Sequence, residues 1–271
     1  MMTRHPLYRS FFGFHREPFS VELNAEEIFT TPALTHFTER FDYVVRLGAI
    51  GLLTGEVGAG KSTALRFAAS RLHPSQYQSL WITACAGSIL ETYRQLAAAL
   101  DVETKSFSRA ALLRTIRHAI YELVNKKIQP LLIIDEASLL RLDVFAELHT
   151  LCQFEADSKP HLPVILAGQN NLLDLLQYRS SLPLASRIVA RSHLEGIDTE
   201  QMQLYLAHHL SIAGVKTQRF SAQAITAIQQ GSAGLLRRAN HLARGALIAA
   251  ANEKCQQVAA EHVRLAATEL V

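Results

Sequence analysis

The pattern of hydrophobic and polar residues changes at about residue 197. Upstream, short apolar runs alternate with amphipathic segments, and these runs cover 49–53, 78–83, 131–134 and 162–168. Unbroken apolar runs separated by helical patterns are typical of parallel strands that helices bury on both faces. Downstream, only helical patterns recur. We therefore predict a parallel α/β domain followed by a small helical domain.

Helix signals fill the spaces between the predicted strands. Pro32 suits the first turn of a helix, and Ser108 suits the position just before one. The predicted helices cover 32–46, 63–69, 88–100, 108–124 and 142–154, and another begins at Leu172. In the helical domain, the openings fall at Asp198 or Thr199, at Ser221 and at Gly234, and Glu261–Leu270 forms the last helix. The predicted parts are an N-terminal segment (1–47) packed on the α/β domain, the α/β domain (48–196) and the helical domain (197–271).

Composition is that of a globular protein, with 49% hydrophobic and 19% charged residues. No apolar run reaches the roughly 18 residues of a membrane-spanning helix, so none is expected, and residues 1–16 lack the apolar region of a secretion signal. Cys85, Cys152 and Cys255 are widely spaced, which favours a reducing, cytoplasmic setting over disulfides or a metal site. A formal charge of +3 permits nucleic-acid binding without requiring it.

Residues 55–62 match the phosphate-binding pattern G-x-x-x-x-G-K-[ST] at every fixed position. The match lies between a predicted strand and a predicted helix, so backbone N–H groups and the helix N-terminus can surround a phosphate. Lys61 is expected to reach the β- and γ-phosphates of ATP, and the Ser62 hydroxyl to ligate Mg²⁺. The predicted nucleotide contacts are Gly55, Glu56, Val57, Gly58, Ala59, Gly60, Lys61, Ser62 and Thr63.

Two carboxylates, Asp135 and Glu136, follow the apolar run 131–134. They fall at the carboxyl end of a predicted parallel strand, where α/β sheets bind their ligands. We expect Asp135 to hold Mg²⁺, directly or through water. We expect Glu136 to polarise the attacking water as a general base.

Polar residues also follow the run 162–168. One of Gln169, Asn170 and Asn171 could hydrogen-bond the attacking water or the γ-phosphate, although Asn171 could simply cap the next helix. Arg187 and Arg191 flank a short apolar strand, from which an arginine could reach a neighbouring subunit's nucleotide.

Two further segments have alternative interpretations. The aromatic-rich residues 11–20, in which Pro18 disfavours a helix, could either cap the α/β domain or flank the adenine of a bound nucleotide. The basic residues near the helix 108–124 could face nucleic acid or form an ordinary solvated surface. They are Arg109, Arg114, Arg117, His118, Lys126 and Lys127.

Together these motifs resemble the AAA+ ATPases, and among them the ExeA-type ATPases, a group that shades into the TnsC- and MuB-like ATPases of transposons. The resemblance covers nearly the whole chain and rests on residues 13–20, 53–62, 134–137, 166–169, 186–188 and 234–240. It implies a P-loop AAA+ parallel sheet core flanked by helices, followed by a small C-terminal helical lid domain. By the same likeness, Gln169 falls at the sensor-1 position, Arg187 at a candidate arginine finger and Arg237 at the sensor-2 arginine that contacts the nucleotide. Gln169 and Arg187 thereby join Glu136 as predicted catalytic residues.

The chain departs from the pattern of the ExeA-type ATPases at three positions. Ser138 and Ser186 stand where that group usually has glutamine, and Leu236 stands where its lid usually has proline. These departures bear on the sensor assignments and leave the predicted ATP and Mg²⁺ site unchanged.

The resemblance implies two functions of different classes. In the first, the ATPase self-assembles with ATP into a ring or filament on double-stranded DNA and recruits or activates a transposase. The alternative is an ExeA-like ATPase for secretion-system assembly, and another kind of DNA-transaction ATPase is a further option. ExeA-like secretion proteins usually continue past the lid into a membrane span and a peptidoglycan-binding domain. Because this sequence shows neither, we expect the transposon role.

Overall fold

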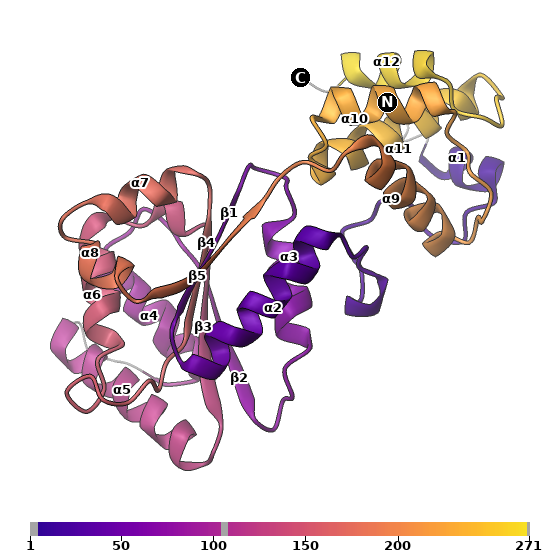
Figure 1. Ribbon diagram of the computed structural model, residues 1–271. Coiled ribbons are helices and arrows are strands. Elements are labelled where there is room, and N and C mark those ends of the chain that lie inside the picture. Colours follow the sequence, from indigo (N-terminus) through magenta and orange to yellow (C-terminus); the bar gives the residue numbers. More distant parts are fainter. Residues whose placement is uncertain (1–4, 104–107, 270–271) are drawn as a thin grey trace. The chain divides into compact units, whose positions relative to one another are not determined.

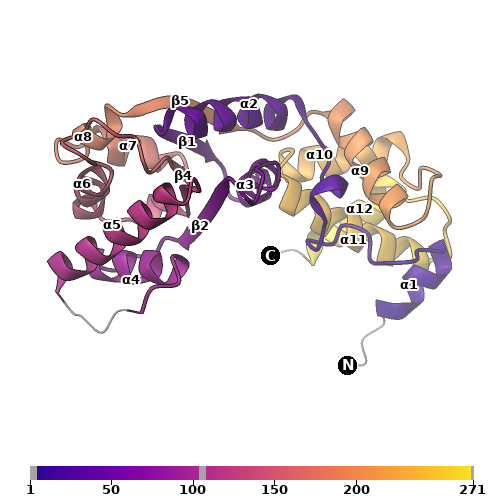
Figure 2. The same ribbon diagram turned by 90° about the horizontal axis from the view of Figure 1, so that it is seen from below.

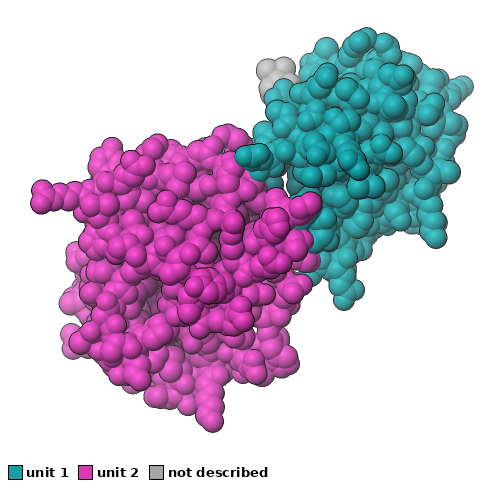
Figure 3. Space-filling model, viewed as in Figure 1, with its two compact units in different colours: residues 1–31, 57–60, 195–271 teal, residues 32–56, 61–194 magenta. Residues whose placement is uncertain are grey.

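The computed structural model of this protein describes residues 5–103 and 108–269. Its contacts divide the chain into two compact units (Figure 3). The α/β unit consists of residues 32–56 and 61–194. The helical unit consists of the residues up to 31, residues 57–60 and the residues from 195 onward. The second boundary therefore follows Leu194, whereas the sequence pattern predicted it after residue 196.

The α/β unit is built on a five-stranded sheet in which all neighbouring strands are parallel (Figure 1). The strand order is β2-β3-β4-β1-β5. The strands are β1 (Ile50–Gly55), β2 (Tyr77–Thr83), β3 (Gln129–Asp135), β4 (Val164–Gly168) and β5 (Ile188–Leu194). Every residue of β1 and β4 is buried, because both strands lie inside the sheet and are covered on both faces. This burial explains the unbroken apolar runs in the sequence.

Helices cover both faces of this sheet (Figure 1 and Figure 2). Helices α2 (Pro32–Leu47) and α3 (Lys61–Ser70) lie on one face. The opposite face carries α4 (Ile89–Ala99), α5 (Arg109–Asn125), α6 (Leu142–Leu151), α7 (Asn171–Gln177) and α8 (Leu182–Ala185). Leu132 and Ile134 of β3 belong to the same buried core as Tyr93 of α4 and Ile116 of α5.

Strand register brings the predicted site residues to one edge of the sheet. Thr54 of β1 lies opposite Gly168 of β4, and Ile134 of β3 lies opposite Leu166 of β4. The segments that leave β1, β3 and β4 therefore start from neighbouring positions at the carboxyl edge. In parallel sheets this is the edge at which ligands bind.

The helical unit has its own hydrophobic core. Its helices are α1 (His5–Phe12), α9 (Thr199–Ile212), α10 (Ala222–Ser232), α11 (Leu236–Asn252) and α12 (Ala260–Thr268). Asp198 caps α9 by accepting a hydrogen bond from the Gln201 amide at 2.8 Å, and Ser221 caps α10 in the same way. The last helix, predicted to end at Leu270, ends at Thr268 in the structure, and Leu270 lies outside the described residues.

The N-terminal aromatic residues lie in the helical unit, which corrects the expectation that they pack on the α/β domain. Tyr8, Phe12, Phe14 and Phe19 are buried in one core with residues of α9, α10 and α11. Phe19 stacks on the His209 ring with the ring centroids 5.1 Å apart. Burial lowers the pKa of His209 to about 3, so its imidazole is neutral near pH 7. No local pattern around Phe19 could indicate this partner, because His209 lies about 190 residues further along the chain.

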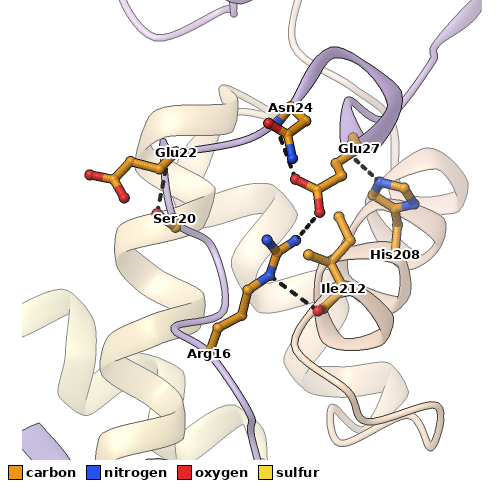
Figure 4. Close-up of polar contacts among 7 residues, drawn as sticks. All are labelled: Arg16, Ser20, Glu22, Asn24, Glu27, His208 and Ile212. Carbon is orange, nitrogen blue, oxygen red and sulfur yellow. Dashed lines mark hydrogen bonds and ion pairs between the residues drawn. The ribbon is translucent and has the colours of Figure 1, made fainter.

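Polar contacts fasten residues 16–27 to α9 (Figure 4). The Arg16 guanidinium donates to the Ile212 carbonyl at 3.2 Å and pairs with Glu27 at 2.5 Å. Glu27 accepts the Asn24 amide through its carboxylate, and its own carbonyl lies 2.7 Å from Nε2 of His208. The segment thus joins the helical unit through both its aromatic core and a polar network.

Candidate nucleotide-binding site

The phosphate-binding loop connects β1 to α3, as its motif predicts. Gly58 and Gly60 have φ values of +88° and +97°, which residues with a Cβ atom rarely adopt. Lys61 is buried, and its Nζ donates to the carbonyl oxygens of Gly55 and Glu56 at 2.9 and 3.0 Å. The ammonium group therefore lies against the start of the loop, and Thr63 follows in the first turn of α3.

Ser62 and Asp135 meet at the carboxyl edge of the sheet. The Ser62 hydroxyl donates to Oδ2 of Asp135 at 2.5 Å, and Oδ1 accepts the Glu136 amide at 2.9 Å. A hydroxyl and a carboxylate oxygen are ligands that Mg²⁺ accepts, together with water and phosphate oxygens. The two residues predicted to hold the metal are thus in contact, and their donor atoms fit this ion.

A cavity of about 550 Å³ opens beside this pair, between α3 and the edge strand β2. It is lined by Ser62, Arg66, Ala69, Ser70, Ser79, Trp81 and Asp135. Trp81, on the edge strand, is 41% exposed. The cavity connects the Ser62–Asp135 pair to solvent and provides space beside the predicted metal ligands.

Glu136 directly follows β3 and has a left-handed backbone, with φ 54° and ψ 32°. Residues other than glycine seldom adopt this conformation, which is enriched at functional sites. It ends the strand and begins the short 3-10 helix Ala137–Leu139. Glu136 is half-buried at the same edge as Asp135. The direction of the backbone thus changes at Glu136, immediately after Asp135.

The polar residues after β4 lie at the same edge. The Gln169 amide donates to the Ser138 hydroxyl at 3.3 Å, and Gly168 approaches Ser138 so closely that an added Cβ would lie 2.9 Å from its nitrogen. Asn170 donates through Nδ2 to Oε1 of Glu56 in the phosphate-binding loop at 3.0 Å. The prediction chose Gln169 from this polar group. The structure adds Asn170 as the residue whose side chain contacts the loop.

Arg187 immediately precedes β5, and its side chain contacts two residues of the α/β unit. Its Nη2 lies 2.5 Å from Oδ1 of Asp157, and its Nε donates to Nδ1 of His149 at 3.1 Å. Arg191, the other arginine considered, is exposed on β5, and its carbonyl accepts a hydrogen bond from Arg40. Ile188, the residue after Arg187, lies opposite Ile50 at the amino end of β1, whereas the phosphate-binding loop follows the carboxyl end of that strand. Arg187 therefore lies at the other edge of the sheet from Ser62 and Asp135.

Arg237 lies in the first turn of α11, in the helical unit. Its amide donates to the carbonyl of Gly58 at 3.1 Å, and both residues belong to this unit. A Cβ atom added to Gly58 would lie 3.0 Å from the Cβ of Arg237, so this approach needs a glycine. The Arg237 side chain is exposed. Its contact with the tip of the loop is made through the backbone.

Two comparisons of sequence agree with this geometry. Residues 45–176 match a family profile described as "AAA domain". The chain is also 30% identical, over 271 residues and 97% of its length, to General secretion pathway protein A of Aeromonas hydrophila. The chain spans 48% of the length of this relative.

Solved structures give the fold. Cdc6p of Pyrobaculum aerophilum superposes with a TM-score of 0.74 at 16% identity, covering 93% of this chain and 70% of that one. The ORC1 protein of Aeropyrum pernix, solved in complex with DNA, gives 0.70 at 16% identity and covers 90% and 67%. The RuvB branch migration motor of Thermotoga maritima gives 0.60 at 18% identity and covers 96% and 73%. The chain has the P-loop AAA+ fold.

Two of the basic residues near α5, for which the sequence left a nucleic-acid surface and an ordinary solvated surface open, contact other groups of the α/β unit. Arg109 pairs with Glu147, and Arg117 donates to the carbonyls of Thr150 and Gln153 while its guanidinium lies 5.6 Å from the Phe154 ring centroid. The remaining residues of this group with exposed positions are Arg114, His118, Lys126 and Lys127. Arg109 and Arg117, two of the three arginines of α5, are thus engaged in contacts within the α/β unit.

Glu253, Cys255 and His262 place three potential metal-ligand atoms within 4.8 Å of one another in the helical unit. His262 accepts the Ala259 amide at Nδ1 and approaches Glu253 with Nε2 at 3.0 Å. A neutral imidazole with an acceptor at Nδ1 carries its proton on Nε2, which leaves no lone pair for a metal. The cluster is therefore explained by capping of α12.

None of the described helices is long and apolar enough to cross a membrane.

Proposed function

We propose that this chain hydrolyses ATP with Mg²⁺, and that full activity needs an assembly in which Arg187 of one copy reaches the nucleotide of the next. The proposal rests on one observation. Lys61, Ser62 and Asp135 lie at one edge of the sheet, and the Ser62 hydroxyl is 2.5 Å from Oδ2 of Asp135. The AAA+ fold supports the same activity.

Each site residue has a role in this proposal. Lys61 exchanges its two carbonyl contacts for β- and γ-phosphate oxygens, and the loop amides surround the same phosphates. Ser62 and Asp135 would hold Mg²⁺, which when bound neutralises phosphate charge. Glu136 accepts a proton from the attacking water, and Gln169 or Asn170 orients that water or the γ-phosphate. Arg237 contacts the nucleotide from the lid.

Within its own chain, the Arg187 side chain contacts Asp157 and His149. In this proposal Arg187 therefore serves the nucleotide of a second copy. The variant Arg187→Ala is expected to hydrolyse ATP on the order of 10³ times more slowly, as arginine fingers do elsewhere. Folding should be little affected, because the Asp157 carboxylate that pairs with Arg187 is exposed and water screens such a pair. Steady-state hydrolysis and thermal unfolding of the purified variant measure both effects.

A mixing experiment isolates the action in trans. Arg187→Ala copies keep a complete phosphate-binding loop, whereas Lys61→Ala copies keep Arg187, so each variant lacks what the other supplies. Mixed assemblies should recover activity that neither variant has alone. An Arg187→Ala protein with full activity would instead point to Arg191 or to no arginine in trans. The same samples, sized with a slow ATP analogue and without nucleotide, test ATP-dependent assembly.

Two roles are candidates for this ATPase, one in secretion-system assembly and one on DNA with a transposase. Thirty per cent identity to General secretion pathway protein A over 97% of the chain favours the ExeA-like role in secretion-system assembly. The role as a DNA-bound regulator of a transposase stays a prediction, and the paired arginines Arg109 and Arg117 weaken the surface proposed for DNA. The solved relatives share too little sequence to favour either role.

Duplex DNA binding separates these two roles. A transposon-type ATPase should retain DNA with ATP at about 0.1 M salt, with little dependence on base sequence and a steep loss of affinity as salt rises. Assembly would supply this affinity by repeating one modest basic surface along the DNA. Retention should be compared with ATP, with ADP and without nucleotide. Protein that hydrolyses ATP and assembles but never retains DNA would support the secretion-type role.

A further inference from the structure

The guanidinium of Arg187 is held along one edge. Nη2 contacts Oδ1 of Asp157 at 2.5 Å, and Nε donates to Nδ1 of His149 at 3.1 Å. A guanidinium has five N–H donors in a rigid plane, so two fixed nitrogens define the orientation of that plane. Nη1 takes part in neither contact. The Arg187 side chain is 24% exposed, so the group is ordered while part of it still reaches solvent.

His149 is arranged to accept from Arg187. Its Nδ1 accepts the Nε–H of Arg187, which requires the proton of the neutral ring to be on Nε2. A hydrogen bond to the backbone of Pro183 engages the ring as well. Burial and the neighbouring Arg187 charge hold the pKa of His149 below its usual value, which keeps the ring neutral and able to accept.

Asp157 is presented by an unusual loop. Glu155, Ala156 and Asp157 have consecutive left-handed φ values of 46°, 53° and 72°, although none of them is glycine. An isolated bridge between Phe154 and Lys159 closes this loop. The hydrogen bond from Arg187 lowers the pKa of Asp157, so the carboxylate is ionised when the two residues meet. Three successive uncommon backbone conformations are thus used to bring one carboxylate to the arginine.

We infer that His149 and Asp157 are positioning residues for Arg187, which they orient so that its Nη1 end is presented to the nucleotide of a neighbouring copy. The inference rests on the proposed function, in which Arg187 acts in trans. An arginine ordered before assembly loses less conformational freedom when it meets a phosphate. The opposite role, in which Asp157 holds Arg187 away from the partner, predicts the opposite result in the experiment below.

The experiment uses the mixed assemblies described above. The acceptor is the Arg187→Ala chain, and the donor is the Lys61→Ala chain with either Asp157→Ala or His149→Ala added. The donor hydrolyses nothing itself, so a second substitution in it can only change how well its Arg187 serves the acceptor. We expect kcat of the rescued acceptor to fall about 10-fold, because small misplacements of a catalytic group are costly. KM for ATP should not change, since the acceptor's own site is intact.

Two further donors make the test specific. Asp157→Asn, which keeps an acceptor oxygen, should lose less rescue than Asp157→Ala and covers the case in which the alanine variant fails to fold. Lys159→Ala, an exposed change in the same loop, should rescue like the unmodified donor. Equal rescue by the Asp157, His149 and Lys159 donors would overturn the inference while the trans role stands, and stronger rescue without Asp157 would also overturn it. Absence of rescue by the unmodified donor would instead contradict the proposed function.

Discussion

Replacing Lys61 with alanine is expected to abolish detectable ATP binding and hydrolysis. Lys61 is buried, and its Nζ donates to the carbonyl oxygens of Gly55 and Glu56 at the start of the loop. Charge-assisted hydrogen bonds contribute about 1.5–3 kcal/mol each, and two of them correspond to a loss of on the order of 10²–10⁴ in affinity. Calorimetric titration with ATP and steady-state phosphate release measure the two effects.

The matched control for this substitution is Lys126→Ala, an exposed lysine next to α5. It removes the same charge from the chain and should bind ATP normally. Lys61→Arg keeps a cation at the loop but changes its shape, so it should recover only part of the affinity. Unchanged turnover by Lys61→Ala in protein with normal circular dichroism would refute the assignment of the site.

Glu136→Gln is expected to bind ATP normally and to hydrolyse it 10²–10⁴ times more slowly, the usual order of the loss of a general base. Glutamine keeps the size of the side chain and its place after β3 but cannot accept the proton. Single-turnover hydrolysis with bound ATP measures the chemical step, and a titration with ATP checks binding.

Asp135→Asn is the informative comparison for Glu136→Gln. Asp135 contacts Ser62, so its loss should weaken the Mg²⁺-dependent part of nucleotide binding as well as the rate. The two adjacent carboxylates would then differ in the step that they affect. If both variants bound nucleotide identically with and without Mg²⁺, the division into a metal ligand and a base would be wrong.

The parallel sheet and the phosphate-binding loop could be predicted because their signals are local. The loop motif, the apolar runs and the carboxylates after β3 are each contained in fewer than ten consecutive residues. Parallel register then brings Gly55, Asp135 and Gln169 to one edge of the sheet without further information. The fold of the core follows from these patterns and from the rule that ligands bind at carboxyl strand ends.

The features that the sequence did not reveal depend on distant partners. The aromatic residues around Phe14 signal burial, but nothing in their spacing indicates that their partners are α9 and α11. The pairing of Arg187 with Asp157 requires a loop conformation that its residue types do not favour. Asn170 could have been chosen over Gln169 only by knowing that Glu56 faces it.

Residues of the helical unit come both before and after the α/β unit in the sequence, and this order has a consequence for biosynthesis. A ribosome adds about 5–20 residues per second, so residues up to 31 precede the completion of α12 by roughly 10–50 s. Residues 32–194 can fold during this interval, while Tyr8, Phe12 and Phe14 have no core to enter. The nascent chain therefore exposes an aromatic segment, which is a substrate for chaperones and a risk for aggregation. Moving residues 1–31 to a position after residue 271 would make the two ends of this unit contiguous and shorten the exposure.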